Sequence, residues 1–236
     1  MRKICVILFS CISFACIAQG STVSATLKRL FVQIPDSFFL PLNRMLSQDV
    51  KNTVAWRREM IDTIEVNDQY SSTRFSITSF DTINCYIRLL AKTGEPEGMS
   101  GEIAYWNRND GTRLVMMTIN YDDMCVSEQH YRYFWIDNGM QLLPVNENEV
   151  FPSLSNADFI SAKFLSKHKK ANELEMPYMI KHADTGNSLE YAPAFDYLFL
   201  CGEYFEDDVW YGLEGEDIIK REIVLAWNGM KFQVQK

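Results

Sequence analysis

Three short turns with glycine after asparagine or aspartate divide apolar stretches of this chain into pairs of segments. The turns are Asn109-Asp110-Gly111, Asn138-Gly139 and Asn228-Gly229. Because glycine readily adopts the positive φ of a tight hairpin turn, each turn predicts two antiparallel strands. The predicted pairs are residues 103–106 with 114–121, 131–136 with 140–145, and 223–227 with 230–234.

Alternation of apolar and polar residues predicts further half-buried strands. One segment places Ile83, Cys85, Ile87 and Leu89 on a single face. The same pattern marks residues 64–66, 75–77, 178–182, 189–191 and 195–201. Residues 94–101 hold three glycines and a proline and therefore predict a loop.

Helical spacing occurs in two places. Apolar residues three and four positions apart predict a helix of about residues 41–55, with Pro35 and Pro41 near its start. Ser155 and Asp158 have the spacing of a capping box, which predicts a second helix through Ile160 and Phe164. Residues 148–155 are interpreted as a linker.

This order of elements predicts an α+β fold of antiparallel β-meander sheets, each preceded by a helix. Segments 133–140 and 225–230 both hold a tryptophan, an Asn-Gly turn and a methionine that opens the returning strand. Their likeness favours two similar helix-plus-meander subdomains, although hairpins in general share such features. The predicted boundaries are a subdomain over residues 27–150 and a shorter one over residues 151–236.

Residues 1–20 have the layout of a secretory signal peptide. Arg2 and Lys3 precede an uncharged run from Ile4 to Ile17, which is too short to span a bilayer. Small residues then allow cleavage before Gln19 or Ser21. The alternative is a lipid anchor on Cys11 or Cys16, although the residues before each cysteine match a lipoprotein signal poorly. We therefore expect export to the periplasm or cell envelope.

The net charge narrows the range of expected partners, and the cysteine count narrows what can stabilise the fold. The net charge is −8, and loss of Arg2 and Lys3 with the leader lowers it to −10, so nucleic acid is not an expected partner. No second stretch approaches the length of a membrane span. Only Cys85, Cys125 and Cys201 would remain after cleavage, so the fold must depend on its core and not on a disulfide framework.

The sequence contains no motif typical of a catalytic or metal-binding site. The three histidines, His130, His168 and His182, lie far apart in the chain, and no Cys-x-x-Cys or Gly-x-Ser-x-Gly occurs. Ser166 to Lys169 has Ser-x-x-Lys spacing, but this run is interpreted as a solvated helix end. We assign no catalytic, cofactor-binding or metal-ligating residue.

Carboxylates and aromatics alternate near the C-terminus, between residues 203 and 217. A glycosidase, a calcium site and a solvated loop all fit this composition. If its aromatics are exposed, the segment is a candidate interaction surface. The candidate residues are Tyr204, Glu206, Asp207, Asp208, Trp210 and Tyr211.

Several short motifs resemble a family of exported proteins of unknown function from Bacteroidales-type gut bacteria. They are Phe31-Val32-Gln33-Ile34-Pro35-Asp36-Ser37, Leu40-Pro41-Leu42, Asn84-Cys85, Phe134-Trp135, Leu143-Pro144 and Asp158-Phe159. The likeness covers roughly residues 27–165, and the chain departs from it in residues 94–101 and in the C-terminal third. The resemblance implies an envelope location and carries over no functional residue.

Together these patterns predict an exported cell-envelope protein that is a non-enzymatic interaction or binding module, whose partner is an envelope protein or a glycan. The alternative is a carbohydrate-active hydrolase that uses carboxylates of residues 203–217. A third hypothesis is an inhibitor, which would need a concave sheet face lined by aromatics.

Overall fold

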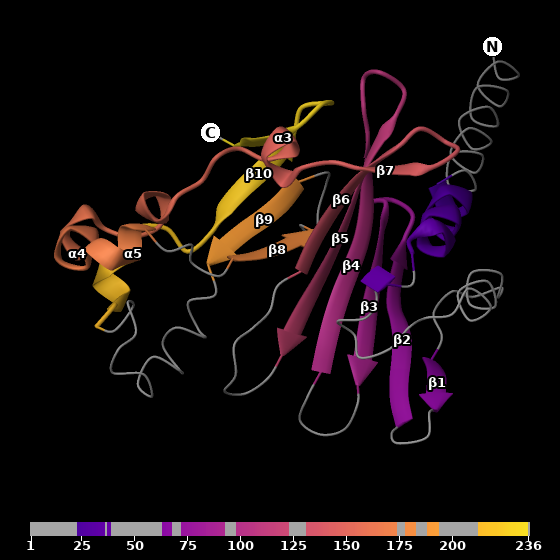
Figure 1. Cartoon of the computed structure of the whole chain (residues 1–236), viewed down its shortest axis with the longest axis horizontal. Helices are drawn as coiled ribbons and strands as arrows, with labels where there is room; N and C mark the ends of the chain where they lie inside the picture. Colours follow the sequence, from indigo (N-terminus) through magenta and orange to yellow (C-terminus); the bar gives the residue numbers. More distant parts are fainter. Residues whose placement is uncertain are drawn as a thin grey trace, which may run out of the picture.

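Two antiparallel sheets dominate the computed structural model, with few helices beside them (Figure 1). The structure describes residues 23–35, 37–38, 63–67, 72–92, 98–122, 131–173, 178–182, 188–193 and 212–235. The predicted α+β class with antiparallel meander sheets is confirmed.

The larger sheet has seven strands in the order β1-β2-β3-β4-β5-β6-β7, so every strand pairs with its neighbour in sequence. Such a meander needs only tight turns between strands, as the glycine-containing turns predict. The strands are β1 Thr63–Asn67, β2 Ser72–Asp81, β3 Tyr86–Lys92, β4 Gly98–Asn107, β5 Arg113–Asp122, β6 Tyr131–Asp137 and β7 Leu142–Pro144.

The smaller sheet is a second meander of four strands in the order β11-β10-β9-β8. Its strands are β8 Tyr178–His182, β9 Ser188–Pro193, β10 Ile223–Trp227 and β11 Phe232–Val234. In β9, buried side chains alternate with partly exposed ones, the signature of a strand with one face on a core.

Helices are short. A helix of residues 23–33, called helix 23–33 below, precedes the larger sheet and ends before Pro35. α3 Glu147–Val150, α4 Ala162–Lys167 and α5 Lys169–Glu173 lie between the sheets along the chain. Single 3₁₀ turns span Asn156–Asp158 and Gly215–Asp217. Within the described residues no helix has the length and apolar character needed to cross a membrane.

Helix 23–33 covers one face of the larger sheet (Figure 1). Its apolar residues recur at helical spacing and are fully buried: Leu27, Leu30, Phe31 and Ile34. They pack on side chains from one face of the central strands, namely Ile87, Leu89, Ile103, Tyr105, Val115, Met117, Ile119 and Trp135. Helix 23–33 thus buries the central strands on this face of the sheet.

The opposite face of the larger sheet packs against the smaller sheet. Trp106, Leu114, Met116 and Phe134 share one buried cluster with Leu189, Tyr191, Ile223, Leu225 and Phe232. The tips of two hairpins also touch, since the Asn109 N–H donates to the Gly229 carbonyl at 2.9 Å and the Trp227 indole donates to the Asn107 carbonyl at 2.9 Å. The central strands are therefore buried on both faces, and the two sheets build one common core.

Two of the predicted turns have the same geometry. In the β6–β7 turn, the Asn138 side chain accepts from the N–H groups of Met140 and Gln141, both at 3.0 Å. In the β10–β11 turn, the Asn228 side chain accepts from those of Met230 and Lys231, both at 2.9 Å. Gly139 and Gly229 have φ values of 90° and 93°, so the positive φ expected of both glycines is present.

Some local expectations differ from the structure. Ile83 was placed on the buried face of a strand, but it lies in the β2–β3 turn and is 87% exposed. A side-chain oxygen of Asp81 stabilises this turn by accepting from the N–H groups of Ile83 and Asn84. The alternating pattern therefore continues through a turn, and the strand itself begins only at Tyr86. The predicted loop 94–101 is shorter, since β4 begins at Gly98.

Residues 148–155, interpreted as a linker, include the last residues of α3 and contribute Val150 and Phe151 to the core. Ser155 and Asp158 do form the predicted capping box, with the Ser155 N–H donating to Asp158 at 2.7 Å. That box caps a 3₁₀ turn, however, and not the predicted helix. The helix α4 begins at Ala162, with Ser161 as its N-cap. The predicted helix 41–55 lies outside the described residues.

Candidate binding pocket

All six residues predicted as an interaction surface lie outside the described residues: Tyr204, Glu206, Asp207, Asp208, Trp210 and Tyr211. The end of the same acidic segment is described. Asp217 accepts from the Ser161 hydroxyl at 3.0 Å, and Glu216 forms a 3.7 Å ion pair with Lys163. Asp217 therefore attaches the C-terminal segment to the start of α4, whereas the exposed Glu216 pair adds little.

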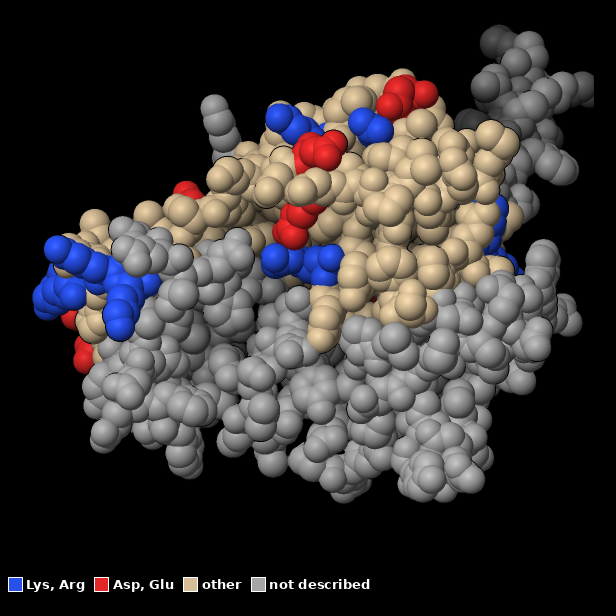
Figure 2. All heavy atoms as spheres, in the orientation of Figure 1, with Lys and Arg blue, Asp and Glu red and all other residues tan. Residues whose placement is uncertain are grey.

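Lysine and arginine gather over α4 and α5, at the end of the molecule far from helix 23–33 (Figure 2). Lys167, Lys169 and Lys170 are exposed there, as the interpretation of this run as solvated implies. Within the described ranges, no group of three or more His, Cys, Asp or Glu has a geometry that could hold a metal ion.

Cys85, a candidate nucleophile by residue type alone, follows the β2–β3 turn with a left-handed φ of 61°. Burial raises the pKa of its thiol, and a hydrogen bond with Tyr105 only partly offsets that effect. The thiolate is the reactive form, so this environment does not activate the sulfur.

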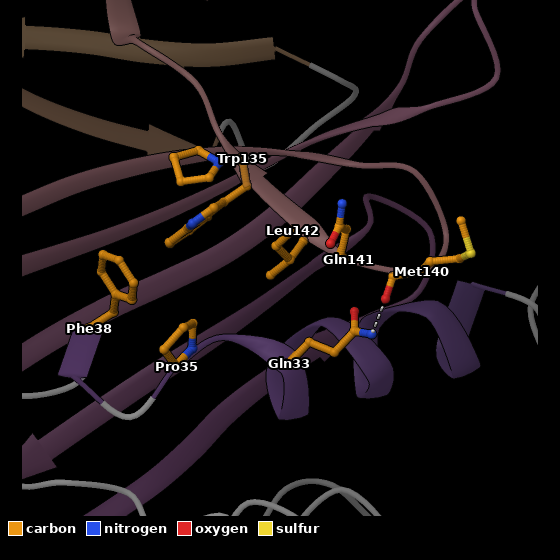
Figure 3. A pocket seen from close by; sticks show the side chains of 8 residues that line it. Gln33, Pro35, Phe38, Trp135, Met140, Gln141 and Leu142 are labelled. Carbon is orange, nitrogen blue, oxygen red and sulfur yellow. Dashed lines mark hydrogen bonds between the residues drawn. The ribbon is translucent and has the colours of Figure 1, made fainter.

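A hollow of about 300 Å³ lies between the end of helix 23–33 and the β6–β7 hairpin. Gln33, Pro35 and Phe38 form one wall, and Trp135 and the hairpin form the other (Figure 3). The hairpin wall comprises Met140, Gln141, Leu142 and Pro144. A mostly apolar hollow of this size with a few polar groups is the usual form of a ligand site.

Two aromatic rings, those of Phe38 and Trp135, line this pocket, and tyrosines of β6 lie beside them. Tyr131, Tyr133 and Trp135 follow one another on the same face of β6, with centroids 6.4 Å and 6.0 Å apart. Phe38 stands edge-on to Tyr133 at 4.6 Å and to Trp135 at 5.0 Å. These T-shaped contacts fix the position of Phe38 against the sheet. The indole of Trp135 reaches toward Phe38 from β6 (Figure 3).

Polar groups at the pocket are few and neutral. The Gln33 amide oxygen accepts from Arg29 at 2.6 Å, and its nitrogen donates to the Met140 carbonyl at 3.4 Å. Gln141 is exposed, and its side-chain amide has no hydrogen-bond partner among the described residues. The same holds for the indole N–H of Trp135, a residue only 3% exposed. The lining therefore contains two polar side chains that have no hydrogen-bond partner among the described residues.

A buried carboxylate fastens the two walls together. Asp137, at the end of β6, is 0% exposed and accepts from Arg29 of helix 23–33 at 3.1 and 2.5 Å. It also accepts from Arg113 at 3.2 Å and from the Gly139 N–H at 2.9 Å. Burial alone would raise the pKa of Asp137, but these hydrogen bonds outweigh it and hold the pKa below its usual range. The carboxylate is therefore ionised at neutral pH.

The sheet ends at this pocket. β7 is three residues long and pairs with β6 through Trp135–Pro144, Ile136–Leu143 and Asp137–Leu142. Pro144 has no N–H, so the outer edge of β7 offers a poor template for a further strand. A ligand of this pocket is therefore expected to contact side chains and not to extend the sheet.

Sequence patterns did not locate this pocket, because its walls are about a hundred residues apart in the chain. One signal was available, since Leu27, Leu30, Phe31 and Ile34 have the spacing i, i+3, i+4, i+7 of an amphipathic helix. Pro35 follows the end of this helix, whereas the helix start that Pro35 and Pro41 predict, at about residue 41, lies outside the described residues. The pairing of Arg29 with Asp137 has no sequence signature.

No protein-family model matches the chain, and no curated protein matches it either. A solved structure with a similar fold is a domain of an uncharacterized protein from Porphyromonas gingivalis W83. The two are 12% identical, with a TM-score of 0.59 over 89% of this chain and 97% of that one. At this identity the likeness shows a shared fold only, one that this chain has in common with an uncharacterized domain of a Bacteroidales species.

Proposed function

We propose that this chain is an exported, non-enzymatic binding module of the cell envelope that holds its partner at the pocket between helix 23–33 and the β6–β7 hairpin. The observation that carries the proposal is a mostly apolar hollow whose lining includes two polar side chains, Trp135 and Gln141, without a hydrogen-bond partner among the described residues. Pre-formed pockets of this kind limit the ordering cost that binding incurs.

The chemistry of the lining favours binding over catalysis. Its eight residues are two glutamines, two prolines, phenylalanine, tryptophan, methionine and leucine. General acid–base catalysis needs a titratable group within hydrogen-bond reach of the substrate, and nucleophilic catalysis needs an activated hydroxyl, thiol or amine. None of these side chains supplies either.

Export is supported by the leader-like residues 1–20 and by the family resemblance in the sequence. The leader lies outside the described residues, so its role rests on its sequence layout. The solved structure that shares this fold comes from Porphyromonas gingivalis, a bacterium of the group that the resemblance names. This agreement supports a bacterial envelope protein.

Cross-linking in intact cells tests the binding half of the proposal. A photoreactive phenylalanine replaces Gln141 at the pocket or, as the control, Lys231 at the same position of the matching turn. Both side chains are exposed, and only Gln141 lines the pocket. We expect a specific envelope adduct from position 141 alone. Equal adducts from both positions, or none from either, would contradict the pocket as the binding site.

Fractionation and intact mass test the export half. The mature form is expected in the envelope or periplasmic fraction, starting at Gln19 or Ser21, or with a lipid on Cys11 or Cys16. Recovery of the uncleaved chain in the cytosol would contradict export.

A further inference from the structure

We infer that the occupant of this pocket is an uncharged, extended peptide segment that contains proline. This inference rests on the proposed function, because it names the ligand class of the same pocket. Three properties of the lining carry it: charge, size, and the balance of donors and acceptors.

Charge complementarity requires a neutral occupant. None of the eight lining side chains carries a charge. Among the described residues, Arg29 and Arg113 already pair with the buried Asp137, which precedes the β6–β7 turn. A charged ligand group would lose hydration on entering this space without gaining a partner ion.

The volume suits a short stretch of chain. A hollow of about 300 Å³ admits one or two residues of a peptide, and the rim that the β6–β7 hairpin forms is exposed. The exposed Met140 and Pro144 at that rim provide further apolar contact. Methionine adapts its shape to different partners, as is common at peptide-binding surfaces.

The polar groups favour a ligand that brings acceptors and few donors. The Trp135 indole can only donate, and the oxygen of Gln33 is already occupied by Arg29. The free side-chain acceptor of the lining is therefore the oxygen of Gln141. A proline in an extended segment supplies a carbonyl acceptor and has no N–H to satisfy. Recognition of proline-rich segments by aromatic-lined grooves uses the same chemistry.

Sugars and acyl chains fit the lining less well. A sugar carries many hydroxyls, and each hydroxyl that is buried without a hydrogen-bond partner weakens binding. An acyl chain would bury the Trp135 N–H without any acceptor and incur the same penalty.

Titration of the purified full chain tests the inference. The probe is a blocked peptide of ten prolines, with a Gly-Ser peptide of equal length and an N-acetylglucosamine hexasaccharide as controls. The chain has five tryptophans, so the indole N–H signals can be resolved by NMR and that of Trp135 assigned by Trp135→Phe. We expect the proline peptide alone to shift the Trp135 signal and to leave the Trp227 signal, whose N–H is bonded to Asn107, in place.

Two variants locate the effect. Gln141→Ala removes an exposed amide and is expected to weaken the proline peptide about fivefold, the size of one hydrogen bond of about 1 kcal/mol. Lys231→Ala, the matched change in the β10–β11 turn, is expected to leave the affinity unchanged. Because Gln141 is exposed, this test does not depend on Trp135→Phe folding well.

A shift of the Trp135 signal by the hexasaccharide and not by the peptide would overturn the peptide class and leave the pocket as a binding site. No shift by any probe would also overturn the peptide class. The cross-linking experiment decides the proposed function independently, since it needs no assumption about the ligand.

Discussion

The β6–β7 and β10–β11 hairpins contain the same four-residue turn but lie beside different neighbours. Both turns begin with Asn-Gly-Met, both asparagines accept from the two N–H groups that follow the glycine, and both glycines have a φ near 90°. Local sequence thus determines the turn in full, as turn chemistry requires.

The residue before each turn asparagine attaches the hairpin to another element. In β6 this residue is Asp137, which binds Arg29 of helix 23–33. In β10 it is Trp227, whose indole donates to the Asn107 carbonyl at the end of β4. One hairpin therefore closes a pocket against a helix, whereas the other joins the two sheets. The comparison shows that contacts with elements distant in sequence, and not the turn itself, determine where each hairpin packs.

The largest expected contrast comes from these anchors. Asp137→Asn leaves Arg29 and Arg113 half-buried without their counter-ion and should lower the free energy of unfolding by about 3 kcal/mol. Trp227→Phe removes one hydrogen bond and should cost about 1 kcal/mol. Urea denaturation of both variants measures the difference. Equal losses would show that the ion cluster does not hold the hairpin more firmly than the single indole contact.

The same anchor predicts a dependence on pH. The pKa of Asp137 is lower in the folded chain than its unfolded value of about 3.9, so its contribution is present above that value. This contribution is lost as pH falls through the folded pKa. Asp137→Asn should therefore flatten the fall of stability below about pH 4. An unchanged acid slope would contradict the role assigned to this carboxylate.

Sequence patterns predicted those parts of the fold that depend on neighbours along the chain. The meanders, the three turns and the capping box of Ser155 all follow from local chemistry. Ile83 was misplaced because alternation continues into a turn that Asp81 stabilises. The pocket was missed because it needs Arg29 beside Asp137, which only the packing of helix 23–33 brings about. The burial of both faces of the larger sheet was also missed, because it depends on helix 23–33 and the smaller sheet, which are distant in sequence.

The two turn glycines should differ in their tolerance of a side chain. Gly139→Ala places alanine at a positive φ with nothing within 4 Å, and should cost about 1 kcal/mol. A Cβ at Gly229 would lie 2.5 Å from the Asn109 side chain as well, so Gly229→Ala should cost about 2 kcal/mol. Equilibrium unfolding compares them. A second change, Asn109→Ala, should bring the two losses together if the contact is the cause.

The turn asparagines should behave alike. Asn138→Ala and Asn228→Ala each remove an oxygen that accepts from two exposed backbone N–H groups. Water replaces much of this bonding, so each variant should lose about 1 kcal/mol of unfolding free energy. A clear difference between them would show that the surroundings of the turns, and not their shared geometry, determine the value of the asparagine.

The turn methionines should separate stability from binding. Met140 is 83% exposed at the pocket rim and Met230 is 40% exposed in the other hairpin, so alanine at either position should change stability by less than about 0.5 kcal/mol. Only Met140 lines the pocket, and Met140→Ala should weaken the ten-proline peptide about twofold, because a small apolar contact is lost. Met230→Ala should leave the affinity unchanged in the same titration. If both variants bind as the unmodified chain does, Met140 contributes nothing, and recognition depends on the other lining residues, Phe38, Trp135 and Gln141 among them.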